Sequence, residues 1–108
     1  MHVLVTGSAG RVGRRVVELL RARGDAVTGF DLKPLGRLDD GYREVIGSFD
    51  DVAAVARAID GAEAVLHLGA FMSWLPADAG RVYAANATGT FHLLAAAAAA
   101  KVRRFVLA

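Results

Sequence analysis

Three glycines, Gly7, Gly10 and Gly13, follow directly on a short apolar run near the start of the chain. Glycine can adopt the backbone of a sharp turn, let a ligand approach the main chain, and let a helix lie close to a strand. The next residues have the apolar spacing of an amphipathic helix, whose free N–H groups would favour an anion such as a pyrophosphate. The pattern therefore predicts a strand, a tight turn and a helix that bind a nucleotide, the alternative being a turn with no ligand.

One acidic residue, Asp31, ends a second short apolar run over residues 26–30. A carboxylate at the tip of the second strand, roughly 20 residues past a glycine turn, is placed to accept hydrogen bonds from the adenosine ribose hydroxyls of NAD. The same charge would repel the 2′-phosphate of NADP. Lys33 and Arg37 lie just beyond and could serve a phosphate. NAD is therefore the expected cofactor, with NADP the less favoured alternative.

The composition limits the class of protein. The 108 residues carry a formal net charge of +2 and no cysteine. This length suits a single domain, residues 1–108, and is short for a complete enzyme with a separate substrate region. Basic residues are scattered among acids, which argues against a nucleic-acid partner. The longest apolar stretch, residues 91–100, is too short to span a bilayer, and the lack of cysteine and of a signal peptide leads us to expect a cytoplasmic protein.

Apolar runs alternate with segments of helical periodicity along the whole chain. Strands are expected at residues 3–6, 26–30, 43–46, 64–68 and 105–108. Helices are expected from the glycine turn to Gly24, from Asp50 or Asp51 to Ile59, and from residue 79 to residue 101, with residues 69–78 as a loop. Such alternation implies right-handed crossovers and a parallel sheet. We predict an α/β fold: a doubly wound, Rossmann-type parallel sheet of about five strands in the order 3-2-1-4-5, with the chain stopping after the fifth strand.

The same periodicity assigns faces to these helices. The inward residues of the first two are expected to be Val12, Val16, Leu19 and Leu20, and then Val52, Val55, Ala56 and Ile59. The third contains six consecutive alanines, Ala95–Ala100. Alanine favours helices and allows close approach, so this face is expected to pack on a neighbouring element or on a partner.

Four motifs in this order resemble one family. They are the glycine turn at residues 6–13, Asp31, His67–Ala70 and Asn86–Thr90. With them, essentially the whole chain resembles the extended short-chain dehydrogenases/reductases, or NAD-dependent epimerase/dehydratase family. The resemblance implies a Rossmann-type sheet, a nicotinamide cofactor, and a small-molecule substrate such as a sugar nucleotide or a related alcohol or ketone. It also suggests a homodimer formed through the alanine-rich helix.

The resemblance further implies which residues meet the cofactor. They are Gly7, Gly10, Arg11, Val12 and Gly13 at the pyrophosphate turn, Asp31 and Leu32 at the adenosine ribose, Ser48 and Phe49 near adenine, Leu68, Gly69 and Ala70 at the nicotinamide-side ribose, and Asn86 as a support from its helix. Relatives carry an aspartate against the adenine amine where this chain has the shorter, uncharged Ser48. No metal ligand is expected.

The loop after the fourth strand stands where relatives meet the substrate. Met72, Ser73 and Trp74 are its candidate contacts. The ring of Trp74 could stack on a sugar or base, or it could cover the edge of the core. His67 lies in an apolar strand, where a histidine is more often packed than catalytic. The remaining histidines and tyrosines, His2, His92, Tyr42 and Tyr83, are expected to be structural.

The family's chemistry needs a tyrosine with a lysine four positions later, because a nearby cation lowers the pKa of the phenol. Tyr42 is followed at that distance by Ile46, and Tyr83 by Ala87. No catalytic pair is therefore expected within these residues, and Asn86 has at most a supporting role. Two hypotheses follow: the chain is the cofactor-binding part of a longer epimerase, dehydratase or dehydrogenase, or it is a non-catalytic dinucleotide-binding or sensing module that associates with another chain.

Overall fold

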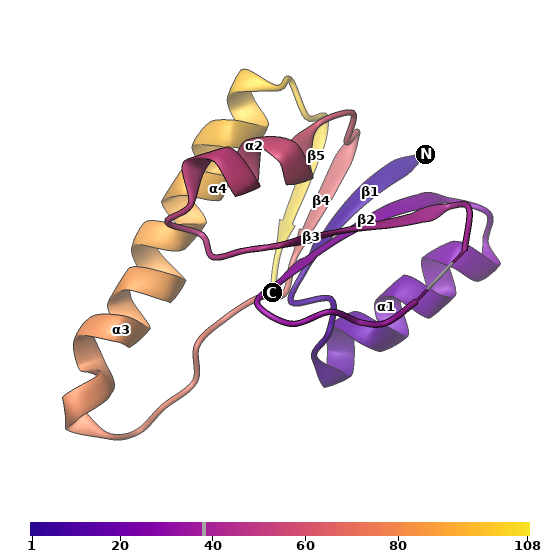
Figure 1. Ribbon diagram of the computed structural model, residues 1–108. Helices are drawn as coiled ribbons and strands as arrows, with labels where there is room; N and C mark the ends of the chain where they lie inside the picture. Colours follow the sequence, from indigo (N-terminus) through magenta and orange to yellow (C-terminus); the bar gives the residue numbers. More distant parts are fainter. Residues whose placement is uncertain (38) are drawn as a thin grey trace.

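The computed structural model describes residues 1–37 and 39–108 and contains one parallel sheet. Its strands are β1 (His2–Thr6), β2 (Ala26–Asp31), β3 (Tyr42–Ile46), β4 (Ala64–His67) and β5 (Arg104–Leu107), in the order β3-β2-β1-β4-β5. The predicted fold class and strand order are confirmed, with strand ends that differ by at most one residue (Figure 1). All five carboxyl ends therefore lie at one edge of the sheet.

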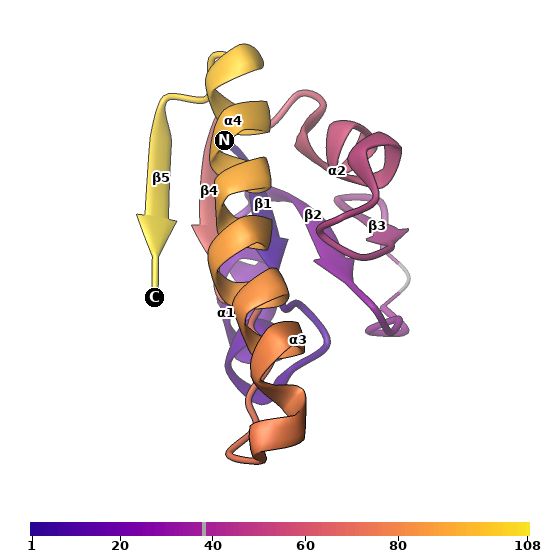
Figure 2. The same cartoon turned by 90° about the vertical axis from the view of Figure 1, so that its left-hand side faces the viewer.

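Helices cover both faces of this sheet. Figure 2 shows α2 (Val52–Ile59) and α4 (Gly89–Ala99) in front of the strands and α1 (Arg11–Ala22) behind them. Side chains of β1 alternate between these layers, with Leu4 in the core under α2 and α4, and Val3 and Val5 in the core under α1. Burial on both faces explains why the central strands read as continuous apolar runs.

The helix ends follow the expected signals. Gly24, with φ of +91°, ends the first helix, and the amide of the next residue, Asp25, donates to Leu20 O at 3.0 Å. The carboxylate of Asp51 caps α2 by accepting from the Ala54 amide at 3.0 Å.

The predicted inward faces of α1 and α2 are partly wrong. Val12 and Leu19 are 64% and 54% exposed, whereas Gly13 and Val17 are buried. The start of helix α1 lies so close to the glycine turn that Gly13 meets the backbone of Gly7 and Ser8, and this contact sets which face of the helix is buried. In α2, Val52 and Ala56 are exposed, and the buried residues are Ala54, Val55, Ala58 and Ile59.

The predicted single helix over residues 79–101 begins earlier and changes its winding. It opens with a 3₁₀ turn at Pro76–Asp78, continues as α3 (Ala79–Tyr83), passes through a π-helical segment, η2 (Ala84–Thr88), and ends with α4 at Ala99. Pro76 at the first position starts the helix because its fixed φ suits a first turn. The π segment has no signal in the periodicity of the sequence, and single π turns often mark functional sites.

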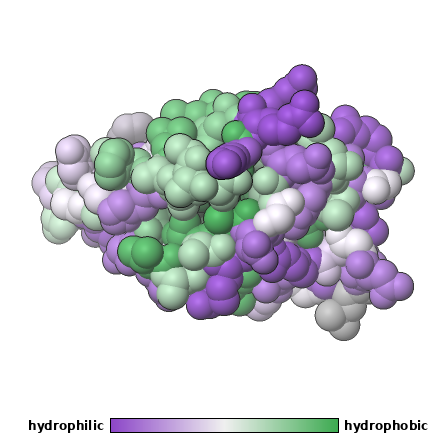
Figure 3. All heavy atoms as spheres, turned by 90° about the horizontal axis from the view of Figure 1, so that it is seen from above, coloured by the Kyte–Doolittle hydropathy of each residue, from purple (hydrophilic) through white to green (hydrophobic). Residues whose placement is uncertain are grey.

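Exposed large apolar residues occur along the chain, and four of them lie on the last two elements. These four are Phe91 and Leu94 on α4 and Val106 and Leu107 on the edge strand β5. Seen from above, hydrophobic surface extends across the middle of the molecule between hydrophilic areas (Figure 3). Within residues 1–37 and 39–108, no helix has both the length and the apolar character needed to cross a bilayer.

The contact between α1 and β1 gives a test of the fold. A Cβ on Gly13 would lie 2.0 Å from the carbonyl oxygen of Gly7, a backbone atom that cannot move aside. Gly13→Ala should therefore lower the free energy of unfolding by about 1–3 kcal/mol in urea titrations, despite the better helix propensity of alanine. Gly80→Ala in α3 is the matched control, since nothing lies within 4 Å of its added Cβ. Equal stability of the two variants would contradict this packing.

Candidate nucleotide-binding site

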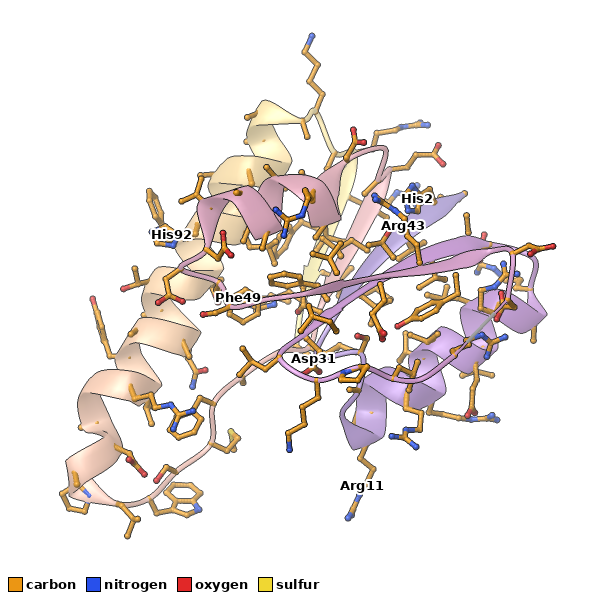
Figure 4. The ribbon with its side chains drawn as sticks, viewed as in Figure 1. His2, Arg11, Asp31, Arg43, Phe49 and His92 are labelled. Carbon is orange, nitrogen blue, oxygen red and sulfur yellow. The ribbon has the colours of Figure 1, made fainter. Side chains whose placement is uncertain are left out.

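A cavity of about 460 Å³ opens at the carboxyl ends of β1, β2 and β4. One wall comes from the strand ends and the loops after β3 and β4, and the other comes from the helix over residues 81–92. Figure 4 shows Asp31, Phe49 and His92 around it. The lining residues are Gly7, Phe30, Asp31, Leu32, Gly47, Ser48, Phe49, Asp50, Leu68, Gly69, Ala70, Phe71, Arg81, Ala84, Ala85, Thr88 and His92.

Gly7 makes the sharp turn at the floor of this cavity. Its φ is +69°, and a Cβ there would lie 2.8 Å from the amide nitrogen of Gly69. Its own N–H donates to Phe30 O at 2.8 Å, which ties the turn to β2. Gly7 is thus required twice, by its left-handed backbone and by the close approach of the loop after β4.

The N-terminus of α1 opens beside this turn without any protein cap. Gly10 occupies the N-cap position in an extended conformation, no side chain caps the helix, and its first turn contains no acidic residue. The first hydrogen bond of the helix itself runs from the Arg14 amide to the Gly10 carbonyl at 2.9 Å. Arg11 extends from this end of the helix away from the strands (Figure 4). The amides before Arg14 carry the positive end of the helix dipole and favour an anion.

Asp31 is held at the end of β2 by backbone amides. Its Oδ2 accepts from the Ala9 amide at 3.0 Å and its Oδ1 from the Lys33 amide at 3.2 Å. A carboxylate has about four acceptor positions, so both oxygens keep capacity for a ligand. The bond to Ala9 also joins β2 to the glycine turn.

The loop after β3 brings the carboxylate of Asp50 into the cavity. Asp50 was not selected as a site residue from the sequence. Ser48 Oγ donates to Asp50 Oδ1, and this hydrogen bond holds the pKa of Asp50 below its ordinary value. Phe49 packs against Phe30, with ring centroids 5.6 Å apart, and against His67 at 5.1 Å. The acidic group at this end of the cavity is thus Asp50, with Ser48 as its donor.

Two anchors fix the loop after β4. The Gly69 amide donates to Thr6 Oγ1 at 3.0 Å. The side-chain amide of Asn86 pairs with both backbone groups of Phe71, accepting from its N–H at 2.8 Å and donating to its carbonyl at 2.9 Å. Asn86 therefore stands behind the cavity wall and positions the loop instead of facing the cavity.

Farther along the loop, the side chains turn to solvent. Trp74 is 94% exposed and Met72 is also exposed, so of the two alternatives given for Trp74, the one in which it covers the core edge is wrong. Ser73 Oγ donates to Asp78 Oδ2 at 2.6 Å, which joins the loop to the start of the following helix. The guanidinium of Arg81 lies over the ring of Phe71, 4.0 Å from its centroid, and places a positive charge at the cavity wall.

Neither tyrosine is placed to act as an acid or base in this cavity. Tyr42 donates to Glu44 Oε1 at 2.9 Å, and burial together with that carboxylate raises its pKa above the ordinary value. Tyr83 is exposed and lies outside the cavity wall formed by the described residues. His67 is buried, and burial lowers its pKa below the ordinary value.

The comparisons with known proteins agree with this geometry. Residues 3–108 match the family described as "NAD dependent epimerase/dehydratase family". The chain belongs to the NAD-dependent epimerase/dehydratase family.

Members of this family resemble the chain over nearly all of its length. A short-chain dehydrogenase/reductase superfamily protein from Agrobacterium tumefaciens, crystallised with bound NAD, is 59% identical with a TM-score of 0.91, and the match covers 99% of this chain and 32% of that one. MoeE5 in complex with UDP-glucose and NAD is 29% identical with a TM-score of 0.89, covering 99% and 36%. The 3 beta-hydroxysteroid dehydrogenase/Delta 5→4-isomerase of Mycobacterium tuberculosis is 36% identical, covering 97% and 30%. The chain thus spans about a third of the length of these relatives.

Half of the residues selected from the sequence line this cavity: Gly7, Asp31, Leu32, Ser48, Phe49, Leu68, Gly69 and Ala70. Of the described residues, those that were expected at the cofactor or substrate but do not line the cavity are Gly10, Arg11, Val12 and Gly13 in the turn and first helix, Met72, Ser73 and Trp74 in the loop, and Asn86 behind the wall. The helical wall was missed, although Arg81, Ala84, Ala85, Thr88 and His92 recur at steps of three or four residues. His92, expected to be structural, lines the cavity, and its Nδ1 lies 3.1 Å from Phe49 O.

Proposed function

We propose that residues 1–108 form the NAD-binding domain of an oxidoreductase or epimerase of this family. The observation that carries the proposal is the arrangement of a bare helix N-terminus and a backbone-held carboxylate on either side of one glycine turn. A dinucleotide presents a pyrophosphate and a ribose diol at that spacing. The cavity extends from Asp31 to the loops after β3 and β4, which leaves room for the bases.

The pyrophosphate would bind at the first turn of α1. The amides of Arg11, Val12 and Gly13 precede the first backbone hydrogen bond of the helix, from Arg14 to Gly10. Gly10 offers no side chain to block them. Backbone N–H groups and the helix dipole then act together on the phosphate charge.

The adenosine ribose would bind to Asp31. The two oxygens of its carboxylate each accept one backbone hydrogen bond and keep room for two hydroxyl donors. A 2′-phosphate at the same place would face this negative charge, so NAD is favoured over NADP. Leu32, which follows, is exposed and lines the cavity, where it would cover the ribose.

The adenine amine would find its acceptor in Asp50. Ser48 stands where relatives carry an aspartate, and its hydroxyl is already donated to Asp50 Oδ1. The carboxylate required by a donor amine is therefore supplied two residues later. Phe49, packed between Phe30 and His67, forms an apolar surface for the ring beside it.

The substrate is inferred to be a small molecule with an alcohol or ketone group, such as a sugar nucleotide. One similar protein was crystallised in complex with UDP-glucose and NAD, and another is named a hydroxysteroid dehydrogenase. The substrate side in such a fold lies at the carboxyl ends of the strands. Here that side carries the exposed side chains of Met72 and Trp74. Trp74 offers a free aromatic face on which a sugar or base could stack.

A second candidate function is a dinucleotide-binding module without catalysis of its own. It is favoured by the sequence, in which no tyrosine is followed four positions later by lysine. In this case cofactor binding would persist and hydride transfer would need groups from another segment or chain. Both candidate functions use the cavity to bind NAD, and only the first includes catalysis. A measurement of NAD binding therefore tests the property that the two candidates share.

We also propose a homodimer through α4. Phe91, Leu94, Ala95 and Ala98 are exposed on this helix, and small residues permit close helix packing. In sedimentation velocity experiments the protein should behave as a dimer and the variant Ala98→Arg as a monomer. Ala53→Arg, on an exposed position of α2, should remain a dimer. A monomeric parent protein would contradict the proposal.

Asp31→Ala tests the cofactor assignment. Loss of charge-assisted hydrogen bonds to the ribose should weaken NAD binding by about tenfold to a hundredfold in isothermal titration calorimetry. NADP should be weakened less, because the repulsion of its 2′-phosphate is removed at the same time. The ratio of the two dissociation constants should therefore move toward NADP.

Asp40→Ala is the matched control for this measurement. Asp40 is exposed and does not belong to the cavity wall of the described residues, so its removal changes the net charge by the same amount and should leave both affinities unchanged. Tighter binding of NADP than of NAD by the parent protein would overturn the assignment of Asp31.

A further inference from the structure

His67 lies at the centre of a continuous line of hydrogen bonds that runs from β1 through β4 to α4. Its Nδ1 lies 2.6 Å from Thr6 Oγ1, and its Nε2 lies 2.8 Å from Thr90 Oγ1. Thr6 Oγ1 accepts from the Gly69 amide at 3.0 Å, and the Thr90 hydroxyl donates to the Asn86 carbonyl at 2.7 Å. The line therefore joins the floor of the cavity to the π segment of its helical wall.

The groups at the two ends of the line determine which atom donates and which accepts in each hydrogen bond. A carbonyl can only accept, so the single proton of the Thr90 hydroxyl is committed to Asn86. Thr90 Oγ1 must then accept, and His67 Nε2 carries the proton. In a neutral ring Nδ1 is consequently an acceptor, and it receives the hydroxyl proton of Thr6.

The surroundings of His67 keep this arrangement dry and neutral. The side chain is 2% exposed, and the ring of Phe49 meets it edge-on at 88° with a centroid distance of 5.1 Å. Phe105 from β5 lies on another side, 6.1 Å away. Chains of buried hydrogen bonds strengthen one another where water is excluded.

The two ends of the line hold the same loop. Gly69 is held through Thr6, and Phe71 is held through Asn86, whose side-chain amide pairs with both backbone groups of Phe71. The line from Gly69 to Asn86 therefore closes a ring of contacts around residues 69–71. These residues form the part of the cavity wall between the glycine turn and the π segment.

We propose that His67 is a positioning residue: as the neutral Nε2–H tautomer it couples Thr6 to Thr90 and so sets residues 69–71 in the geometry that receives the nicotinamide half of the cofactor. This role rests on the proposed NAD-binding function. It assigns His67 no proton transfer to substrate. Its consequence is that Thr6 and Thr90, on β1 and α4, act on cofactor binding as one unit.

A double-mutant cycle on NAD affinity tests the coupling. Thr6→Val and Thr90→Val each remove one hydroxyl at nearly constant shape, and each should raise the dissociation constant for NAD about tenfold. The double variant should bind about as weakly as the weaker single variant, because either change already breaks the line. Thr28→Val is the control, because Thr28 is also a buried threonine but is hydrogen-bonded to His2 and Arg43. The fold-changes in the dissociation constant caused by Thr28→Val and Thr90→Val should multiply in the double variant.

Imidazole ¹⁵N NMR provides a readout that needs no cofactor. The two-bond ¹H–¹⁵N correlations of His67 should show the proton on Nε2 in the parent protein, and the Gly69 amide should exchange faster with solvent in Thr90→Val. An Nδ1–H tautomer, a charged ring at neutral pH, or multiplicative effects of Thr6→Val and Thr90→Val would overturn the proposal. If the parent protein shows no NAD binding, the proposed function fails, and the tautomer and exchange data still decide whether the line exists.

Discussion

The structure depends on the close approach of three backbone segments at Gly7. A side chain at Gly7 would collide with the backbone at Gly69, and one at Gly13 would collide with the Gly7 carbonyl at 2.0 Å. These distances bring β1, the start of α1 and the loop after β4 together at a single point. The uncapped helix end and the cavity floor therefore share one rigid support. Strands, helices and cavity walls are arranged around this contact.

Around that support, fixed polar groups lie along one edge of the sheet in an order that suits a dinucleotide. The bare amides of α1 come first, Asp31 follows at the end of β2, and Asp50 lies at the end of β3. On the other side, Asn86 and the line through His67 hold the loop after β4. The polar side chains in these positions are themselves hydrogen-bonded, so little order has to be gained when a ligand binds.

The sequence was sufficient for the sheet and for the glycine turn, because continuous apolar runs and glycine spacing are local properties of the sequence. It was not sufficient for the faces of α1, since the position of that helix depends on the contact of Gly13 with Gly7 in the turn and not on the apolar stripe. The role of Asp50 depends on a loop conformation, and the π segment carries hydrogen bonds between Asn86 and Phe71, which are fifteen residues apart in the chain. Arg81 and His92 could have been found from their helical spacing once a cavity beside that helix was assumed.

An NMR titration of the ¹⁵N-labelled protein with NAD is the most direct test of the account. The amides of residues 7–13, 31–32, 48–50 and 69–71 should shift together and saturate, while those at the amino ends of the strands, such as Val27 and Ala64, should not. Such a pattern would place the dinucleotide across the glycine turn. Absence of shifts at millimolar NAD, or shifts confined to α4 and β5, would contradict a cofactor site at this edge of the sheet.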